Sequence, residues 1–171
     1  MRIVGGTFAG RDLVSPNDFR VRPTAEQVRA ALLDVLAKDL PGSRVLDLFA
    51  GTGALGLEAM SRGAASADFV EFRPASLHAL KANVAALKLR ERTRIFKKDA
   101  MAFILGIKPP GYDIAFADPP YTSRLLERVL ALWRGQRFAR ILAVEHSASL
   151  QLPPGAHRKR FEESAITVYR S

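Results

Sequence analysis

The sequence predicts an α/β fold with a mainly parallel sheet, and three observations support this prediction. From about residue 44 onward, short apolar runs alternate with segments whose apolar residues recur every three or four positions, as expected for strands separated by helices. The first apolar run leads into a glycine-rich turn. The chain has 171 residues, 48% of them hydrophobic, which is enough to bury one sizeable core. We therefore expect a single domain over residues 1–171, with a hairpin-like extension at residues 1–23 before a core at residues 24–171.

The N-terminal part is expected to contain a small hairpin and one amphipathic helix. Residues 2–6 and 11–14 can pair with each other outside the main sheet. The helix is expected to begin at Thr24, whose hydroxyl can cap it while Gln27 reaches back from three residues later. A Pro-Gly pair at residues 41–42 then ends the helical pattern.

The next segment predicts the first half of the sheet. Strands are expected at residues 44–49, 67–71 and 93–97. A short helix follows the glycine-rich turn and ends near Gly63, which can adopt the left-handed cap conformation. Pro74 suits the first turn of the helix after the second strand, because its missing N–H would have no partner there.

The remaining segment predicts the second half of the sheet. A short helix after Asp99 stops before the Pro-Pro-Gly at residues 109–111, and Thr122 can cap a later helix. The last connecting helix is expected to be short or absent, because the spacing between the fifth and sixth strands barely meets the roughly dozen residues that a parallel crossover needs. The expected strands are at residues 112–117, 141–145, 157–161 and 165–169.

The composition favours a polyanionic partner and excludes several kinds of site. The formal net charge is +9, and lysine and arginine side chains release counterions when they neutralise phosphates. Cysteine is absent and the three histidines are scattered, so no metal site is expected. No signal peptide or apolar run of about 20 residues is present, so we expect a cytoplasmic protein without a membrane span.

The turn after the first strand is the expected cofactor site. Asp47 lies near the end of the strand, and Gly51, Gly53 and Gly56 satisfy the spacing G-x-G-x-x-G, in which glycine lets the backbone approach a ligand closely. That spacing alone fits a nicotinamide cofactor as well. A pyrophosphate, however, binds at a helix N-terminus and would be repelled by a carboxylate, whereas the sulfonium and ammonium groups of S-adenosylmethionine would be attracted by one. Asp47 therefore favours S-adenosylmethionine and methyl transfer.

Acidic side chains also end the second and third strands. Glu71 is placed to bind ribose hydroxyls, and Asp99 to accept a hydrogen bond from the adenine amino group. In the alternative interpretation, Asp47 and Asp99 are helix caps and Glu71 is a solvated strand end. Three acids at one sheet edge favour the ligand site. Its expected contacts are Asp47, Phe49, Ala50, Gly51, Gly53, Glu71, Asp99 and Ala100.

The expected chemical site is the sequence Asp118-Pro119-Pro120-Tyr121, directly after the fourth strand. It resembles the signature of methyltransferases that act on amino groups conjugated to a ring or a carbonyl. The Asp118 carboxylate and the Pro119 carbonyl can each accept one N–H of a planar amino group, while the prolines fix the backbone. Tyr121 can stack on a base turned out of its helix. A plain turn is the alternative, but the position after this strand favours the site.

Longer segments resemble the RsmD family of bacterial 16S ribosomal RNA guanine-N2 methyltransferases, over nearly the whole chain. The similar segments, in order, are residues 2–6, 10–11, 22–24 with 28–29, 47–59 and 118–121. The resemblance implies a Rossmann-like class I S-adenosylmethionine-dependent methyltransferase with a seven-stranded, mostly parallel sheet. As substrate it implies guanine 966 of 16S ribosomal RNA, in assembled or partly assembled small subunits.

The N-terminal extension is the expected contact with RNA, because its basic residues have little reason to belong to the sheet. Charge and the family resemblance together favour contact with phosphate over pairing with Asp18 or Glu26. The residues concerned are Arg2, Arg11 and Arg22 of the extension and Arg29 of the helix that follows it.

Several other functions stay open at this point, and a monomer is expected. An adenine-N6 methyltransferase would use the same cofactor and the same tetrapeptide. A protein-glutamine methyltransferase is less favoured, because relatives of that kind usually carry asparagine at the position of Asp118. A nicotinamide-dependent oxidoreductase differs in its cofactor, and a non-catalytic RNA-binding domain would bind no S-adenosylmethionine.

Overall fold

A mixed sheet of seven strands forms the centre of the computed structural model, which describes residues 1–16 and 25–171. The strand order is β3-β2-β1-β4-β5-β7-β6, and the first five strands along the chain are parallel. Strand β7 runs antiparallel between β5 and β6. This arrangement confirms the expected seven-stranded, mostly parallel sheet. The strands are β1 (Arg44–Asp47), β2 (Ser66–Val70), β3 (Thr93–Phe96), β4 (Tyr112–Ala117), β5 (Ala139–Ser147), β6 (His157–Arg160) and β7 (Ser164–Arg170).

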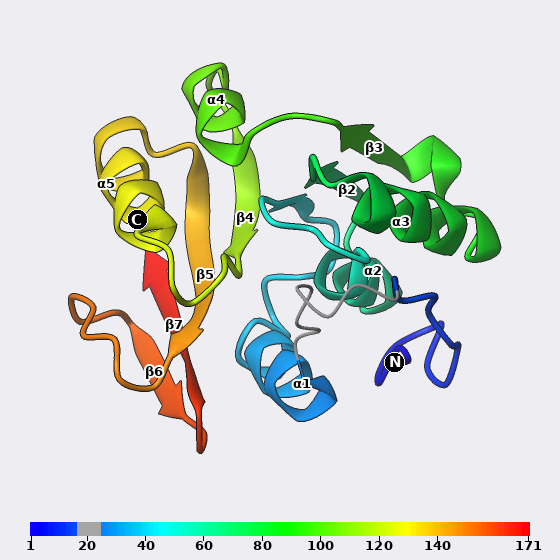
Figure 1. Cartoon of the computed structure of the whole chain (residues 1–171), viewed down its shortest axis with the longest axis horizontal. Helices are drawn as coiled ribbons and strands as arrows, with labels where there is room; N and C mark the ends of the chain where they lie inside the picture. The colour runs from blue at the N-terminus through cyan, green and yellow to red at the C-terminus, as the bar shows by residue number, and fades with distance from the viewer. Residues whose placement is uncertain (17–24) are drawn as a thin grey trace.

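Helices cover both faces of the sheet. Figure 1 shows α1, α2 and α3 on one face and α4 and α5 on the other. Alternate residues of the buried strands enter two separate cores: Ile114 and Phe116 face α1 to α3, whereas Ala115 and Ala117 face α4 and α5. The helices are α1 (Glu26–Val35), α2 (Ala54–Ser61), α3 (Pro74–Ala86), α4 (Ala100–Leu105) and α5 (Leu125–Gln136), with a 3₁₀ turn at Arg90–Arg92. Within the described residues, no helix is long and apolar enough to cross a membrane.

The connection from β5 to β6 contains no helix, as the short spacing predicted. Residues 148–156 instead form a loop that is fastened to the sheet. Arg158 donates from Nε to Thr167 Oγ1 at 3.0 Å and from Nη2 to the Leu152 carbonyl at 3.0 Å. Because no crossover helix is available, β6 and β7 add to the sheet as an antiparallel hairpin.

The predicted helix starts are only partly correct. Pro74 occupies the first turn of α3, as expected. Thr24 lies outside the described residues, and α1 has Ala25 at its N-cap without a side-chain hydrogen bond. Thr122 does not cap α5, which begins at Leu125 after Arg124. The reason is a tight turn after the two prolines, in which Ser123 N–H and Oγ both donate to the Pro120 carbonyl and delay the helix.

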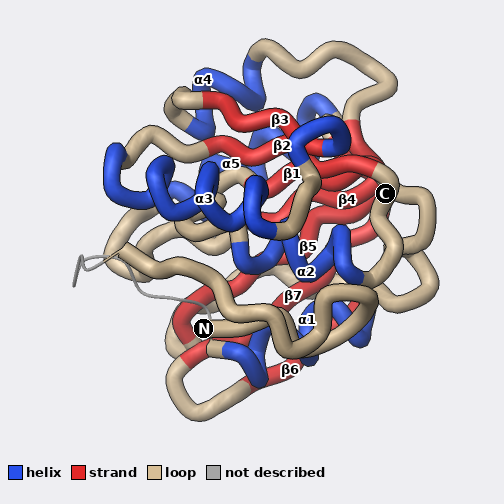
Figure 2. Tube along the Cα trace, turned by 90° about the vertical axis from the view of Figure 1, so that its right-hand side faces the viewer, coloured by secondary structure: helices blue, strands red, loops and turns tan. Residues whose placement is uncertain are grey.

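The N-terminal segment packs onto the helices of the α1 to α3 face (Figure 2). The expected hairpin is present as one antiparallel bridge between Arg2 and Asp12. Ser61 Oγ of α2 donates to the Gly5 carbonyl at 2.6 Å and accepts from Phe8 N–H at 2.8 Å. Asn83 of α3 pairs with the N–H and the carbonyl of Val14 and also donates to the Thr52 carbonyl at 2.9 Å. The segment is therefore bonded to the two helices nearest the glycine-rich turn.

Two glycines of this segment offer a matched stability test. Gly6 and Gly10 both have positive φ, at 81° and 83°, but a Cβ on Gly6 would collide with the Ser61 carbonyl, whereas a Cβ on Gly10 meets nothing within 4 Å. We expect Gly10→Ala to lower the free energy of unfolding by about 1–2 kcal/mol through the left-handed conformation alone. Gly6→Ala should cost about 1–3 kcal/mol more through overpacking. Urea unfolding of both variants measures the difference, and equal losses would mean that the segment does not pack on α2.

Candidate active site

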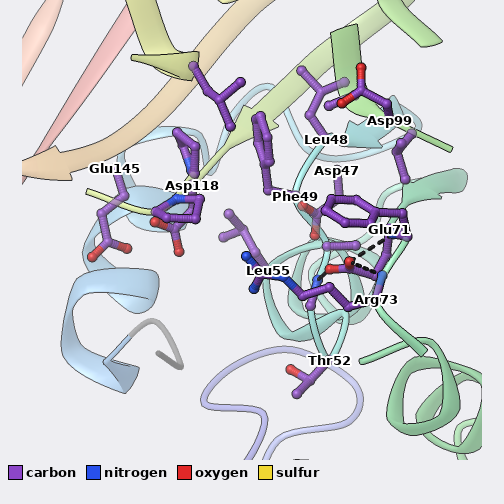
Figure 3. A pocket seen from close by; sticks show the side chains of 18 of the residues that line it. Asp47, Leu48, Phe49, Thr52, Leu55, Glu71, Arg73, Asp99, Asp118 and Glu145 are labelled. Atoms are coloured by element: carbon purple, nitrogen blue, oxygen red, sulfur yellow. Dashed lines mark hydrogen bonds between the residues drawn. The ribbon is translucent and has the colours of Figure 1, made fainter. Parts of the chain in front are cut away.

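A cavity of about 370 Å³ opens at the carboxyl ends of the parallel strands. This volume lies in the range of about 300–1,000 Å³ that is usual for small-molecule sites. Figure 3 shows side chains from several strand ends pointing into it. Of the residues predicted for the cofactor and the chemistry, all but Gly53 line this cavity: Asp47, Phe49, Ala50, Gly51, Glu71, Asp99, Ala100, Asp118, Pro119, Pro120 and Tyr121.

Gly53 has a structural role instead of forming the cavity wall. It is the N-cap of α2 with φ at 81°, and a Cβ there would collide with the Leu80 side chain. The left-handed turn and the close packing under α3 require glycine at this position, and the contact of Gly53 with the cofactor stays a prediction. Gly56, one turn later, similarly lets α2 approach Phe69 of β2.

Glu71 fixes the shape of the glycine-rich turn. Its Oε2 accepts a hydrogen bond from Gly51 N–H at 2.9 Å, and its Oε1 accepts from the N–H groups of Phe72 and Arg73, both at 2.8 Å. The residue is 8% exposed, so it is not the solvated strand end of the alternative interpretation. Three backbone donors hold one carboxylate against the cavity and join the end of β2 to the turn after β1.

Asp47 is a buried carboxyl group at the cavity wall. Its Oδ2 accepts from Gly56 N–H at 3.1 Å, inside the first turn of α2. Burial raises the pKa of Asp47 to about 7; the Gly56 N–H opposes this shift and the charge of Glu71 adds to it. Asp47 therefore accepts from the start of α2, as the helix-cap alternative expected. A cation bound near Asp47 would favour its ionised form.

Asp99 both caps a helix and lines the cavity. One carboxylate oxygen accepts from Ala102 N–H at 3.0 Å, which makes Asp99 the N-cap of α4. The capping interpretation is thus correct for this residue. Asp99 nevertheless lines the cavity, and its carboxylate has further lone pairs that can accept from a ligand donor.

The Asp118 to Tyr121 segment occupies the other end of the cavity. In Figure 3, Asp118 and Glu145 lie at one side and Asp99 and Glu71 at the other. The Tyr121 hydroxyl donates to Glu145 Oε1 at 2.8 Å. Burial first, and then the carboxylate of Glu145, raise the pKa of the Tyr121 phenol, which therefore stays protonated. One wall of the cavity is thus a fixed aromatic ring beside two carboxylates.

Four aromatic or charged residues line the cavity but were not predicted from the sequence: Phe72, Arg73, Lys98 and Glu145. Phe72 is 56% exposed, an unusual state for a phenylalanine. A signal existed for Glu145, because it ends the predicted fifth strand just as Asp47 ends the first. No periodic pattern distinguishes Arg73 and Lys98 from other surface cations.

The residues expected to contact RNA divide into three groups. Arg2 and Arg11 are exposed, although Arg2 lies 3.5 Å from Glu26 and Arg11 donates to the Ala86 carbonyl. Arg22 lies outside the described residues. The expectation for Arg29 is wrong, because its side chain is fully buried and forms an ion pair with Glu58 at 2.7 Å.

The topology separates this chain from the nicotinamide-binding fold. A dinucleotide-binding domain has the strand order 3-2-1-4-5-6 with parallel strands. Here the antiparallel β7 lies between β5 and β6. The oxidoreductase interpretation of the three glycines is therefore not supported by the fold.

Comparisons with known proteins point to one family. A model of the family described as conserved hypothetical protein 95 matches residues 1–162. The chain is 42% identical over 132 residues to ribosomal RNA small subunit methyltransferase D of Escherichia coli, an alignment that covers 77% of this chain and 66% of that protein, just under two thirds. The corresponding Haemophilus influenzae protein is 34% identical, with 77% and 69% covered. A solved structure of a hypothetical protein from Thermus thermophilus superposes with a TM-score of 0.88 at 32% identity, covering 100% and 99% of the two chains.

Proposed function

This chain belongs to the RsmD family, described as conserved hypothetical protein 95, and from that membership we propose that it methylates the N2 amino group of a guanine in 16S ribosomal RNA. One observation carries the proposal. A single cavity joins acids at three successive strand ends, Asp47, Glu71 and Asp99, to the Asp118-Pro119-Pro120-Tyr121 segment at the fourth.

The residues of the cavity fit S-adenosylmethionine as the methyl donor. Asp47 is a buried carboxyl whose ionised form needs a nearby cation, which the ligand's ammonium and sulfonium groups provide. Glu71 would accept from the ribose hydroxyls, and Asp99 from the adenine amino group. Phe72 offers an exposed ring to a planar base. When bound, the donor supplies an electrophilic methyl carbon.

The Asp118 segment would hold and activate the acceptor amine. The Asp118 carboxylate and the Pro119 carbonyl each accept one N–H, which draws the nitrogen lone pair out of conjugation and directs it at the methyl carbon. Once the amine had accepted the methyl group that the donor would supply, the cationic nitrogen would lose a proton to Asp118 or to water. A carboxylate is too weak a base to deprotonate the neutral amine beforehand. Tyr121 would stack on the flipped base.

The charge of the protein supports ribosomal RNA as the substrate. A net charge of +9 favours a polyanion, and Arg73 and Lys98 line the cavity while Arg2 and Arg11 are exposed on the N-terminal segment. Family membership directs the choice to 16S ribosomal RNA in assembled or partly assembled small subunits. We propose that the protein acts there as a monomer in the cytoplasm.

The deciding experiment is transfer of radiolabelled methyl groups from S-adenosylmethionine to purified small subunits that lack the modification. Naked 16S ribosomal RNA and DNA are assayed in parallel, and the labelled nucleoside is identified after digestion. We expect N2-methylguanosine from the subunits. Label in adenine would replace the proposal with adenine-N6 methylation, and a protein that binds the donor without any transfer would contradict an enzymatic function.

Donor binding is expected to strengthen as the pH rises from about 6 to 8. With a pKa of about 7, Asp47 is partly protonated in the free protein, and a bound cation favours the carboxylate, so binding releases a proton. Affinity should increase by up to about tenfold per pH unit below the pKa and level off above it. The free energy of unfolding of the free protein depends on pH in the opposite direction. Because burial raises the pKa of Asp47 from 3.8 to about 7, its contribution to folding is fully present below pH 3.8 and is lost as the pH rises to about 7.

Calorimetric titration in two buffers of different ionisation enthalpy measures this proton release. Asp47→Asn is the control, because its amide oxygen can still accept from Gly56 N–H but cannot titrate. The ligand's own amino group also titrates, so the slope that remains in Asp47→Asn belongs to the ligand. If both proteins release the same number of protons, Asp47 does not sense the bound donor.

A further inference from the structure

A second carboxylate stands beside Asp118 at the substrate end of the cavity. Glu145 comes from β5, the strand next to β4, and is only 5% exposed although it lines the cavity. Figure 3 shows the Glu145 and Asp118 side chains at the same side, away from Asp99. Neither donor binding nor amine activation, as derived above, uses this carboxylate.

Tyr121 donates a hydrogen bond to one of the two oxygens of Glu145. The phenol donates to Oε1 at 2.8 Å, and the raised pKa of Tyr121 keeps it a donor. A carboxylate has two oxygens with about four lone-pair sites and, when ionised, offers no donor at all. A base stacked on Tyr121 would therefore lie in the part of the cavity whose wall contains the Glu145 carboxylate.

Guanine and adenine differ next to the reacting amino group. In guanine the ring nitrogen N1, adjacent to the carbon that carries N2, bears a hydrogen and donates. In adenine the ring nitrogen N1, adjacent to the carbon that carries N6, is a bare acceptor. Enzymes that flip a base read such differences on its Watson–Crick edge.

We propose that Glu145 is a specificity-determining residue that accepts the N1–H of the target guanine and excludes adenine. This inference rests on the proposed function. With Asp118 and the Pro119 carbonyl holding the amino group, an acceptor from the neighbouring strand meets N1–H of guanine with a charge-assisted hydrogen bond and opposes the lone pair of adenine N1. A hydrogen-bonding site of this kind discriminates far more strongly than an apolar pocket.

The experiment compares guanine with 2-aminopurine, which keeps the N2 amino group but has a bare N1. The labelled nucleotide is first mapped with the wild-type protein on small subunits. Subunits are then reconstituted around 16S ribosomal RNA in which splinted ligation has placed guanine or 2-aminopurine at that nucleotide. Single-turnover methylation at saturating donor gives the ratio of the two rates for the wild type, Glu145→Gln and Tyr121→Phe.

We expect the wild type to prefer guanine by at least about tenfold, the effect of one charge-assisted hydrogen bond. Glu145→Gln should react more slowly with guanine and lose most of the preference, because its amide can also donate to a bare N1. Tyr121→Phe keeps the ring but removes the hydroxyl and its hydrogen bond to Glu145. This variant should keep the preference even if it is slower, which separates reading of the base from support of the tyrosine ring.

Three outcomes would overturn the inference. The wild type could methylate 2-aminopurine as fast as guanine, a result that needs no variant. The preference could persist in Glu145→Gln, which would assign it to guanine O6. Tyr121→Phe could lose the preference equally, which would make Glu145 a support for Tyr121 alone. Failure of the proposed function is visible earlier and separately, as a mapping step in which no guanine is labelled.

Discussion

Replacing Asp118 with alanine is expected to lower kcat for methyl transfer by about a thousandfold or more, which corresponds to about 4 kcal/mol of transition-state stabilisation. Asp118 follows β4 at the cavity end that faces away from Asp99 and Glu71. It would act on the acceptor amine and not on the donor, so the Kd of S-adenosylhomocysteine should change by only a few-fold. Single-turnover kinetics and calorimetry on the same preparation measure the two quantities.

Asp113→Ala is the matched control for this variant, because Asp113 lies on the same strand at its opposite end. Its Oδ2 accepts from Arg44 N–H at 2.8 Å and its Oδ1 lies 3.6 Å from Arg140, far from the cavity lining. Methyl transfer by Asp113→Ala should match the wild type. If Asp118→Ala instead weakened donor binding as much as it slowed transfer, Asp118 would be part of the cofactor site and the amine would need another acceptor.

The residues at the strand ends could be predicted because they follow from chain order alone. Parallel strands bring their carboxyl ends to one edge, so locating the strands also locates Asp47, Glu71 and Asp99. The prolines after β4 likewise mark where pairing must stop, which placed Asp118 at the same edge. No knowledge of side-chain packing was needed for these predictions.

Predictions that depended on packing were less successful. Gly53 satisfies a cofactor spacing, yet the neighbour that requires glycine is Leu80, which lies 27 positions later in the sequence. Thr122 has the right chemistry for a cap, but the preceding turn moves the helix start to Leu125. The contact between Glu145 and Tyr121, 24 positions earlier, joins two distant parts of the chain and is not indicated by any local pattern.

Arg29 is the clearest case of a charge whose role could not be inferred from sequence. Its partner Glu58 lies on α2, and Glu58 Oε1 also accepts from the N–H groups of Val4 and Gly5 and from Arg62 Nη2 at 3.2 Å. Arg29 Nη2 in turn donates to the Arg2 carbonyl. One buried ion pair therefore connects α1, α2 and the N-terminal segment, and an arginine in this position stabilises the fold instead of contacting phosphate.

Arg29→Met is accordingly expected to lower the free energy of unfolding by about 3–5 kcal/mol, since removing one partner leaves the Glu58 charge buried among fewer donors. Arg170→Met is the matched control: Arg170 pairs with Asp39 at 2.8 Å, but with the two side chains 43% and 25% exposed, and should cost no more than about 1 kcal/mol. Urea unfolding gives both values.

Glu58→Gln keeps an acceptor for the N-terminal segment, so adding it to Arg29→Met should cost less than the two single losses combined, by about 1–3 kcal/mol. If Arg29→Met were as stable as Arg170→Met but bound RNA more weakly, the result would contradict the structural role and would support contact of Arg29 with phosphate.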